Sequence, residues 1–223
     1  MAVLAAPRWE AVTPEARDLL AALGQLPLVH PFYLAGGTAL ALRLGHRISR
    51  DLDLFANIEA LDDPLRQGIL EELRRGHAVE LWQDSVMGLV LKVDEQPVSF
   101  FSYGYPLLDP TDLVGGVQIA GMLDIGLMKL DAIAGRGTRK DFYDVYFIAS
   151  HTPLDELFAR SGDKYPGSRS FGMRVLTALV DFDIAEQEDE PIMLRAVEWD
   201  QVKAFFSAQA RRLGREWLDQ EEF

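Results

Sequence analysis

A glycine pair set between a strand-like run and a helix-forming run, with two spaced aspartates after it, is the feature that most constrains this chain. Residues 32–35 form a short apolar run typical of a strand, and residues 38–44 are strong helix formers closed by a glycine. Residues 51–55 then alternate acidic and apolar, which is the period of a half-buried strand. Because side chains alternate along a strand, Asp51 and Asp53 must point to the same side.

This order of elements predicts a phosphate and metal site. Gly36 and Gly37 allow the backbone to approach a phosphate closely, and the amides at a helix start attract anions. Thr38 can serve as a helix cap or as a hydroxyl donor to a phosphate oxygen. Asp51 and Asp53 can hold one or two Mg²⁺ ions, which would neutralise a triphosphate and help to activate an attacking hydroxyl. Each pattern alone is typical of a turn or a solvated strand face, but their combination favours an active site.

The remainder of the chain divides into a strand-rich part and a helical part. A helix at 62–75 and a turn at 94–97 accompany strands expected at 78–82, 87–93, 98–103 and 117–120. Further helices are expected at 14–23, 124–136, 139–149, 154–160, 168–179 and 200–218. We therefore predict an α+β protein with an α/β core at 1–121 and a helical domain at 122–223.

Composition excludes several kinds of chemistry. The 223 residues include no cysteine, which removes disulfides, thiolate catalysis and cysteine zinc sites. A net charge of −13 argues against broad, sequence-independent binding of nucleic acid, but it leaves room for a local basic cleft. The start of the chain lacks a basic region before its apolar residues and no stretch has the apolar length of a membrane span, so a cytoplasmic protein is expected. The arginines around the predicted site are Arg43, Arg47, Arg50, Arg136 and Arg139.

Two blocks of sequence carry a resemblance to a known family. Residues 33–42 with 45–55, and residues 129–146, resemble the nucleotidyltransferase AbiEii/AbiGii toxin family, a branch of the polymerase-β-like nucleotidyltransferase superfamily. The resemblance implies a nucleotidyltransferase fold, in which a small mixed sheet is flanked by helices. It also implies transfer of a nucleotide from an NTP to an acceptor hydroxyl, with Mg²⁺ or Mn²⁺, an RNA such as tRNA as acceptor, and an antitoxin protein as partner. No family is apparent past residue 149.

The roles of the family's functional residues can be assigned to matching residues of this chain one at a time. The resemblance assigns phosphate binding to Gly36, Gly37 and Thr38, and metal binding to Asp51 and Asp53. It further implies that the helical domain completes the active site, with Lys129 on the triphosphate and with Asp141 and Asp144 as a later acidic motif. Helical spacing places Lys129 on a partly apolar stripe and puts Asp141 and Asp144 on one face of the next helix. Asp144 or Asp141 would orient Lys129 or an acceptor group. An ordinary ion pair between Lys140 and Asp144 is the alternative for that motif. The predicted catalytic set is Asp51, Asp53, Lys129 and Asp144, and the predicted nucleotide-binding set is Gly36, Gly37, Thr38, Lys129 and Asp141.

One departure from the superfamily bears on catalysis. A third carboxylate commonly lies on a neighbouring strand, where this chain has Ser99, and the nearest acid, Asp94, falls in the expected turn. The alternative to an enzyme is therefore a degenerate module of the same fold that binds nucleotide or a protein without turnover. Phosphotransfer at the same site is a third reading. Tyr103 and Tyr105 could stack on a base or could be ordinary half-buried aromatics at a strand end. His46, Arg47 and Arg50 could contact phosphate or acceptor, or the arginines could pair with the two aspartates.

Overall fold

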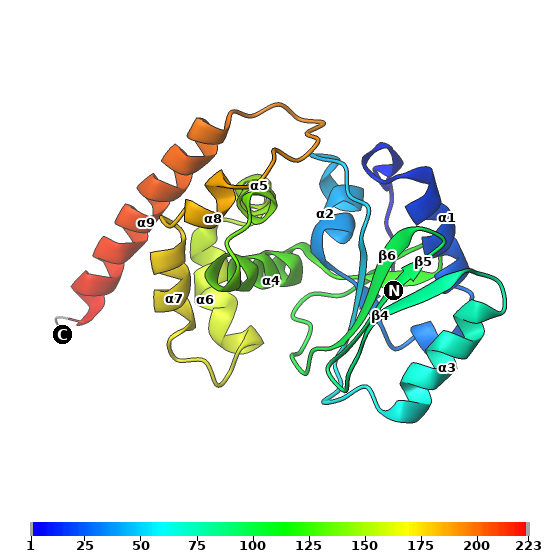
Figure 1. Ribbon diagram of the computed structural model, residues 1–223. Helices are drawn as coiled ribbons and strands as arrows, with labels where there is room; N and C mark the ends of the chain where they lie inside the picture. The colour runs from blue at the N-terminus through cyan, green and yellow to red at the C-terminus, as the bar shows by residue number, and fades with distance from the viewer. Residues whose placement is uncertain (1, 222–223) are drawn as a thin grey trace. The chain divides into compact units, whose positions relative to one another are not determined.

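The computed structural model describes residues 2–221, with side chains as far as residue 216. The chain divides into two compact units, Met1–Gly121 and Met122–Phe223, and each is described by itself (Figure 1). The first unit is a mixed sheet with helices and the second is entirely helical, so the predicted α+β class is confirmed. No helix in the described part of the chain is long and apolar enough to cross a membrane.

The first unit is built on one mixed sheet. Its strands lie in the order β1-β7-β8-β2-β3-β6-β5-β4. Parallel pairing joins β3 to β6, β2 to β8 and β1 to β7, and the remaining neighbours are antiparallel. The bounds are β1 Ala2–Val3, β2 Tyr33–Leu34, β3 Leu52–Ala56, β4 Val79–Asp84, β5 Gly88–Val93, β6 Gln96–Ser102, β7 Asp112–Val114 and β8 Val117–Ile119.

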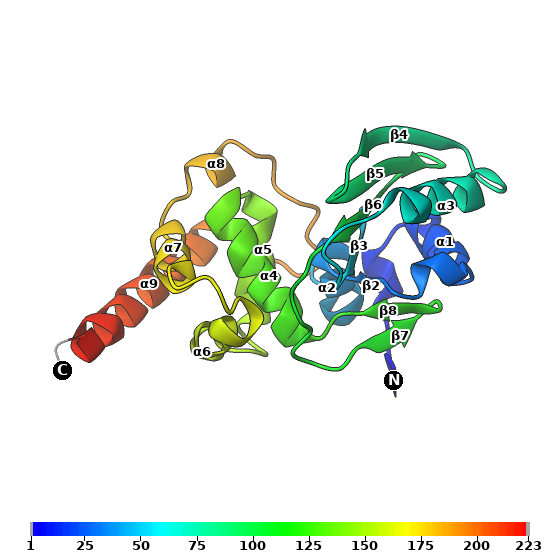
Figure 2. The same ribbon diagram turned by 90° about the horizontal axis from the view of Figure 1, so that it is seen from below.

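The two faces of this sheet differ in character. On β3, Leu52, Leu54 and Ala56 are fully buried, whereas Asp53 and Phe55 are half-buried, as the alternating pattern predicts. Helix α1 (Pro14–Leu23) contacts β8, and helix α3 (Asp63–Arg74) contacts β4; both are labelled in Figure 2. The apolar face forms the core, and the face of Asp53 is left for polar and aromatic side chains.

Helix α2 (Gly36–Leu44) begins directly after β2, two residues earlier than expected. Its N-cap is Ala35, which offers no side-chain cap, so the prediction of Thr38 as a cap is wrong and Thr38 is the third residue of the helix. Gly45 ends the helix with a φ of 62°, a left-handed conformation that suits glycine at this position.

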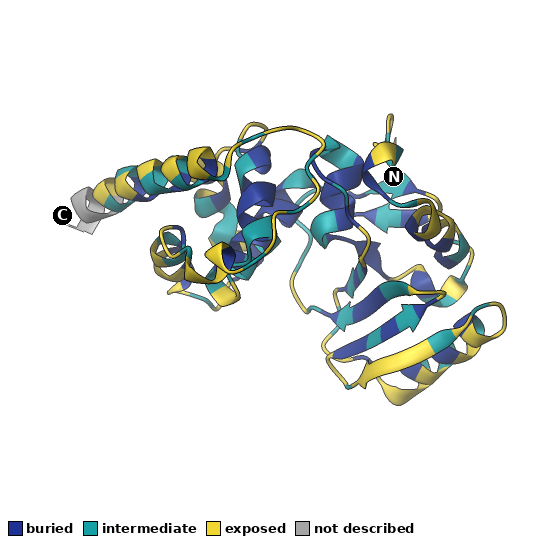
Figure 3. Ribbon diagram, turned by 45° about the horizontal axis from the view of Figure 1, so that its top comes forward, coloured by how far each residue is buried: buried dark blue, intermediate teal, exposed yellow. Residues whose placement is uncertain are grey.

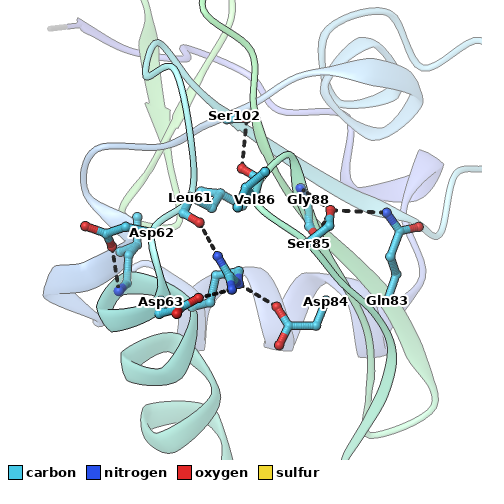
Figure 4. A network of polar contacts seen from close by, with 11 residues as sticks. Leu61, Asp62, Asp63, Gln83, Asp84, Ser85, Val86, Gly88 and Ser102 are labelled. Atoms are coloured by element: carbon cyan, nitrogen blue, oxygen red, sulfur yellow. Dashed lines mark hydrogen bonds and ion pairs between the residues drawn. The ribbon is translucent and has the colours of Figure 1, made fainter.

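The hairpin of β4 and β5 is joined to α3 by a polar network (Figure 4). Arg66 of α3 donates to the Asp84 carboxylate at 2.5 Å and also bonds to Asp63 and to the carbonyl of Leu61. The Ser102 hydroxyl donates to the carbonyl of Val86 at 3.4 Å. β4 itself is the edge strand of the sheet and is largely exposed (Figure 3).

The turn between β5 and β6 is shorter than predicted. Asp94 and Glu95 have φ of 46° and 70°, and Pro97, which was expected in the turn, lies in β6 opposite Lys92. The Asp94 carboxylate accepts the Ala78 N–H at 2.8 Å and lies 2.5 Å from the His77 ring. That contact with His77 holds the pKa of Asp94 below its usual value.

The second unit is a helical bundle with an aromatic centre. Phe142 packs edge-on against Phe206 and Trp199, with ring centroids 5.2 and 5.9 Å apart. A fully buried ion pair joins Lys164 to Asp124 at 2.7 Å. The predicted helices are confirmed, and α8 is an addition to them. The bounds are α4 Met122–Gly135, α5 Arg139–Ile148, α6 Leu154–Lys164, α7 Phe171–Ala178, α8 Asp183–Glu186 and α9 Trp199–Glu221.

Candidate active site

The two carboxylates of the first unit are held at the start of β3. Asp53 belongs to β3 and is half-buried. Asp51 is exposed and lies immediately before the first residue of β3. The Thr38 hydroxyl donates to the Asp51 carbonyl at 2.5 Å and lies 2.9 Å from the Ser49 hydroxyl. Because Thr38 is only 1% exposed, its hydroxyl fixes the backbone at Asp51 from within the core. Its predicted contact with phosphate stays a prediction.

Each glycine of the pair lies close to a polar side chain of the site. Gly36 has a φ of 65°, and a Cβ added there would come within 3.0 Å of Oδ2 of Asp53. A Cβ at Gly37 would lie 2.5 Å from Nη2 of Arg47. The Ala35 N–H donates to the Asp53 carbonyl at 3.0 Å. This hydrogen bond holds the residue before helix α2 against β3. The left-handed backbone at Gly36 therefore favours glycine there, whereas at Gly37 an added side chain would have to displace the end of the Arg47 side chain.

The neighbouring strand provides no third acid. Asp53 is paired directly with Ser99 across β3 and β6, as the sequence position of Ser99 led us to expect. β6 carries no carboxylate, and Asp94 lies in the turn with its oxygens bonded to His77 and Ala78. Within the described residues, no group of three or more His, Asp or Glu side chains is placed to share a metal ion. The site is thus a pair of carboxylates.

This donor set suits a hard divalent cation. Mg²⁺ binds oxygen ligands and is commonly held by one or two carboxylates together with substrate phosphates. Asp51 and Asp53 are such a pair, and the absence of a side chain at Gly36 lets the start of α2 lie close to the Asp53 carboxylate. The residues present therefore fit one Mg²⁺ shared between the protein and a bound triphosphate.

Basic residues in the loop before β3 take different positions. Arg47 is only 5% exposed, and it donates to the Ile48 carbonyl at 3.1 Å with its guanidinium against Gly37. His46 is fully buried, whereas Arg50 is exposed. Arg47 and His46 thus belong to the interior of the loop that carries the carboxylates, and Arg50 is the one of the three that faces solvent.

In the second unit, the predicted lysine and acids form a buried ion cluster. The Lys129 ammonium lies 2.8 Å from Asp141 and 2.6 Å from Asp144, and both carboxylates are fully buried. Arg136 donates to Asp141 through Nε at 2.8 Å and Nη2 at 3.0 Å, and the Thr138 hydroxyl donates at 2.6 Å. Burial alone would raise the pKa of Asp141, but Lys129 and Arg136 hold it well below its usual range. The role of these residues in nucleotide binding stays a prediction.

Comparison with known proteins places this geometry in context. Residues 18–87 match the family model described as nucleotidyl transferase AbiEii toxin, Type IV TA system. An uncharacterised protein of Aquifex aeolicus (strain VF5), aq_aa25, is 35% identical over 204 residues, which are 88% of this chain and 95% of that protein. JHP933 from Helicobacter pylori has a similar fold, with a TM-score of 0.52, 18% identity, and coverage of 95% of this chain and 97% of its own. MenT4, a nucleotidyltransferase toxin from Mycobacterium tuberculosis H37Rv, is similar at a TM-score of 0.52 and 20% identity, covering 90% of this chain and 88% of its own.

Proposed function

Because this chain belongs to the nucleotidyl transferase AbiEii toxin family and is a nucleotidyltransferase, we propose that Asp51 and Asp53 hold the Mg²⁺ of an NTP whose nucleotide is moved to an acceptor hydroxyl. The observation that carries this proposal is the close approach of the Gly36 backbone to the Asp53 carboxylate, where a Cβ would lie 3.0 Å from Oδ2. Because glycine has no side chain, the helix start and the carboxylate can lie this close together, so that one phosphate can reach both the helix amides and a cation held by Asp53.

The reaction requires one bond to form and one to break. The acceptor oxygen forms a bond to the α-phosphorus, the bond from that phosphorus to the bridging oxygen breaks, and pyrophosphate leaves with the electron pair. When bound, the metal ion supplies positive charge, which stabilises the negative charge that develops on the phosphate oxygens. The acceptor proton must also leave. Ser99, beside Asp53, is a poor base at neutral pH, so deprotonation is left to the Asp51 or Asp53 carboxylate or to water.

The start of α2 is suited to the phosphates themselves. Gly36 and Gly37 open the helix, and the N–H groups of a helix's first turn lack intrahelical partners and point towards its N-terminal end. These groups and the helix dipole favour an anion at this end. We assign the β- and γ-phosphates of the NTP to this helix start, with Thr38 fixing Asp51 from behind.

Within the second unit, we propose that Lys129 binds phosphate, the role that the family resemblance implies. Its ammonium is bonded to Asp141 and Asp144 within the second unit, so those carboxylates hold its position and its charge. In this proposal Asp141 and Asp144 act on the nucleotide through Lys129, and Asp141 is in turn held by Arg136 and Thr138.

The acceptor and the biological setting are also part of the proposal. We favour an RNA such as tRNA as acceptor, in the cytoplasm where NTP and tRNA are found together. The family description supports a toxin role, and we propose that the chain is the toxin of a toxin–antitoxin pair.

The test is transfer of label from each α-labelled NTP to bulk tRNA with Mg²⁺. We expect label on the RNA with one or more NTPs, and its loss in Asp53→Asn. Asp131→Asn, at a half-exposed surface pair with Arg174, is the matched control and should transfer as wild type does. Mg²⁺-dependent nucleotide binding without transfer would instead identify a binding module without turnover.

A further inference from the structure

A continuous row of aromatic rings lies on the sheet face that carries Asp53. We call it the aromatic row, and it consists of Tyr33, Phe55, Phe101, Tyr103 and Tyr105. Tyr33 and Phe55 stack with centroids 6.2 Å apart, and Phe55 contacts Phe101 at 5.2 Å. Tyr103 is 5.3 Å from Phe55 and 5.0 Å from Tyr105. The rings thus cross β2, β3 and β6 and continue into the segment after β6, all within the first unit.

The row begins beside the candidate metal site. Phe55 follows Asp53 by two residues, so it shares the same face about 7 Å further along the strand. On β6, a polar residue is likewise followed two positions later by an aromatic one: Ser99 pairs with Asp53, and Phe101 pairs with Phe55. A ligand held by phosphate at Asp53 therefore has aromatic side chains as its next neighbours on this face.

The packing of the row leaves it partly open. Tyr33 is buried, Phe55, Phe101 and Tyr103 are half-buried, and Tyr105 is 39% exposed, so the row becomes more open from β2 towards the segment after β6. This contrasts with the opposite face of the same strands, where Leu54 and Phe100 are fully buried. A row that served only as core would be expected to bury its rings to the same degree.

A glycine keeps one of these rings close to the sheet. Gly88 on β5 pairs with Phe101, and a Cβ added to Gly88 would come within 2.9 Å of the Phe101 ring. The Phe101 ring thus lies over the backbone of β5 at Gly88. At the other end of the row, Tyr33 pairs with Gln118 on β8. The residues that flank the row on the two adjacent strands, Gly88 and Gln118, are therefore both uncharged.

We propose that the aromatic row is a nucleobase-stacking subsite that continues the phosphate site at Asp53. Aromatic side chains bind bases by stacking in any sequence, since every base has a π-face. The chain carries a net charge of −13, which disfavours long contacts to a phosphate backbone, and stacking supplies affinity that needs no cation. This inference rests on the proposed function for its phosphate site, and the base comes either from the NTP or from an unpaired end of the acceptor.

The test uses 2-aminopurine, a fluorescent base whose emission is quenched when it stacks. One arm uses 2-aminopurine riboside triphosphate with Mg²⁺, and the other uses a single-stranded RNA ten nucleotides long with a terminal 2-aminopurine. The variants are Tyr103→Leu and Tyr105→Leu, which keep apolar bulk and remove the ring, and Tyr105→Phe, which keeps the ring. Trp82→Leu is the control, since Trp82 is 51% exposed on β4 and lies outside the row.

We expect quenching in at least one arm, with the dissociation constant raised about 5- to 150-fold by each Tyr→Leu change, which corresponds to one lost base stack. Tyr105→Phe and Trp82→Leu should match wild type. An effect on the triphosphate alone assigns the row to the NTP base, and an effect on the RNA alone assigns it to the acceptor.

Failure of the inference can be told apart from failure of the proposed function. If label is transferred to tRNA but both Tyr→Leu variants match Trp82→Leu in both arms, the aromatic row is not a base site. If no label is transferred but quenching depends on Tyr103 and Tyr105, the row is a base site and the proposed reaction is wrong. Absence of quenching in wild type in both arms would also overturn the stacking subsite.

Discussion

The two units each hold a pair of aspartates, and the pairs are in opposite situations. Asp51 is exposed and Asp53 is half-buried, and the glycine start of helix α2 lies close to the Asp53 carboxylate. Asp141 and Asp144 are fully buried, and both are bonded to the Lys129 ammonium. The first pair includes an exposed carboxylate, whereas the charge of the second pair is balanced by Lys129 inside the protein. The first pair is thus expected to govern chemistry, and the second to stabilise the fold and to hold Lys129 in position.

The largest expected effect concerns the first pair. Asp53→Asn should lower the rate of nucleotide transfer about a thousandfold, the scale seen when one preorganised charge-stabilising group is lost at an active site. The free energy of unfolding should change little, because the side chain is half-buried at the edge of the site. Initial rates and urea unfolding of the same preparation measure both quantities. A large loss of stability together with activity would remove the contrast between the two units.

The second effect is the converse, in the helical unit. Asp141→Asn should lower the free energy of unfolding by about 3–5 kcal/mol, since it takes one of two carboxylates away from the buried Lys129 ammonium. The change is measured by urea unfolding followed by circular dichroism. Asp131→Asn, whose carboxylate is half-exposed, should cost no more than about 1 kcal/mol. Equal effects of the two substitutions would show that the buried cluster does not stabilise the fold.

A smaller effect is expected at Thr38, whose hydroxyl positions the backbone of Asp51. Thr38→Val should cost about 1–3 kcal/mol of stability, because the Asp51 carbonyl loses its buried donor. Transfer should also fall, since the backbone before β3 is no longer fixed, and Thr38→Ser should restore both. Unfolding and transfer rates are measured together. A Thr38→Val protein with wild-type transfer would show that this hydrogen bond does not position Asp51.

The smallest effect is the dependence of stability on pH. The pKa of Asp141 is lowered in the folded state, so its contribution to stability is present above the unfolded pKa of about 4 and is lost as the pH falls below it. The free energy of unfolding of wild type should therefore decline on the acid side of pH 4 more steeply than that of Asp141→Asn. Parallel curves for the two proteins would show that Asp141 is not paired in the folded state.

Local patterns in the sequence predicted the order of elements around Asp51 and Asp53. The order of strand, glycine pair, helix and spaced aspartates is set by neighbouring residues, and the register of Ser99 with Asp53 agrees with its sequence position. Strands β1 and β7 were not predicted. β1 pairs with the distant strand β7, which the local sequence does not indicate, whereas β7 forms a hairpin with β8 across Gly115 and Gly116, a local turn signal that the prediction did not use.

Tertiary partners were the part that could not be predicted. Helical spacing placed Asp141 and Asp144 on one face, but only the packing of α4 against α5 shows that both bond to Lys129. Thr38 is similar, because its sequence neighbours indicate a helix start, whereas its actual partner is the Asp51 carbonyl thirteen residues away. In both cases the deciding contact joins separate elements.

The most direct test of the central claim compares two labels on one substrate. The protein is given the NTP that supports transfer, labelled once at the α-phosphate and once at the γ-phosphate, together with acceptor RNA and Mg²⁺. Nucleotide transfer at Asp51 and Asp53 predicts that the α-label appears on the RNA, that the γ-label appears in pyrophosphate, and that both are lost in Asp53→Asn. Appearance of the γ-label on the RNA without the α-label would show phosphotransfer and would contradict the account.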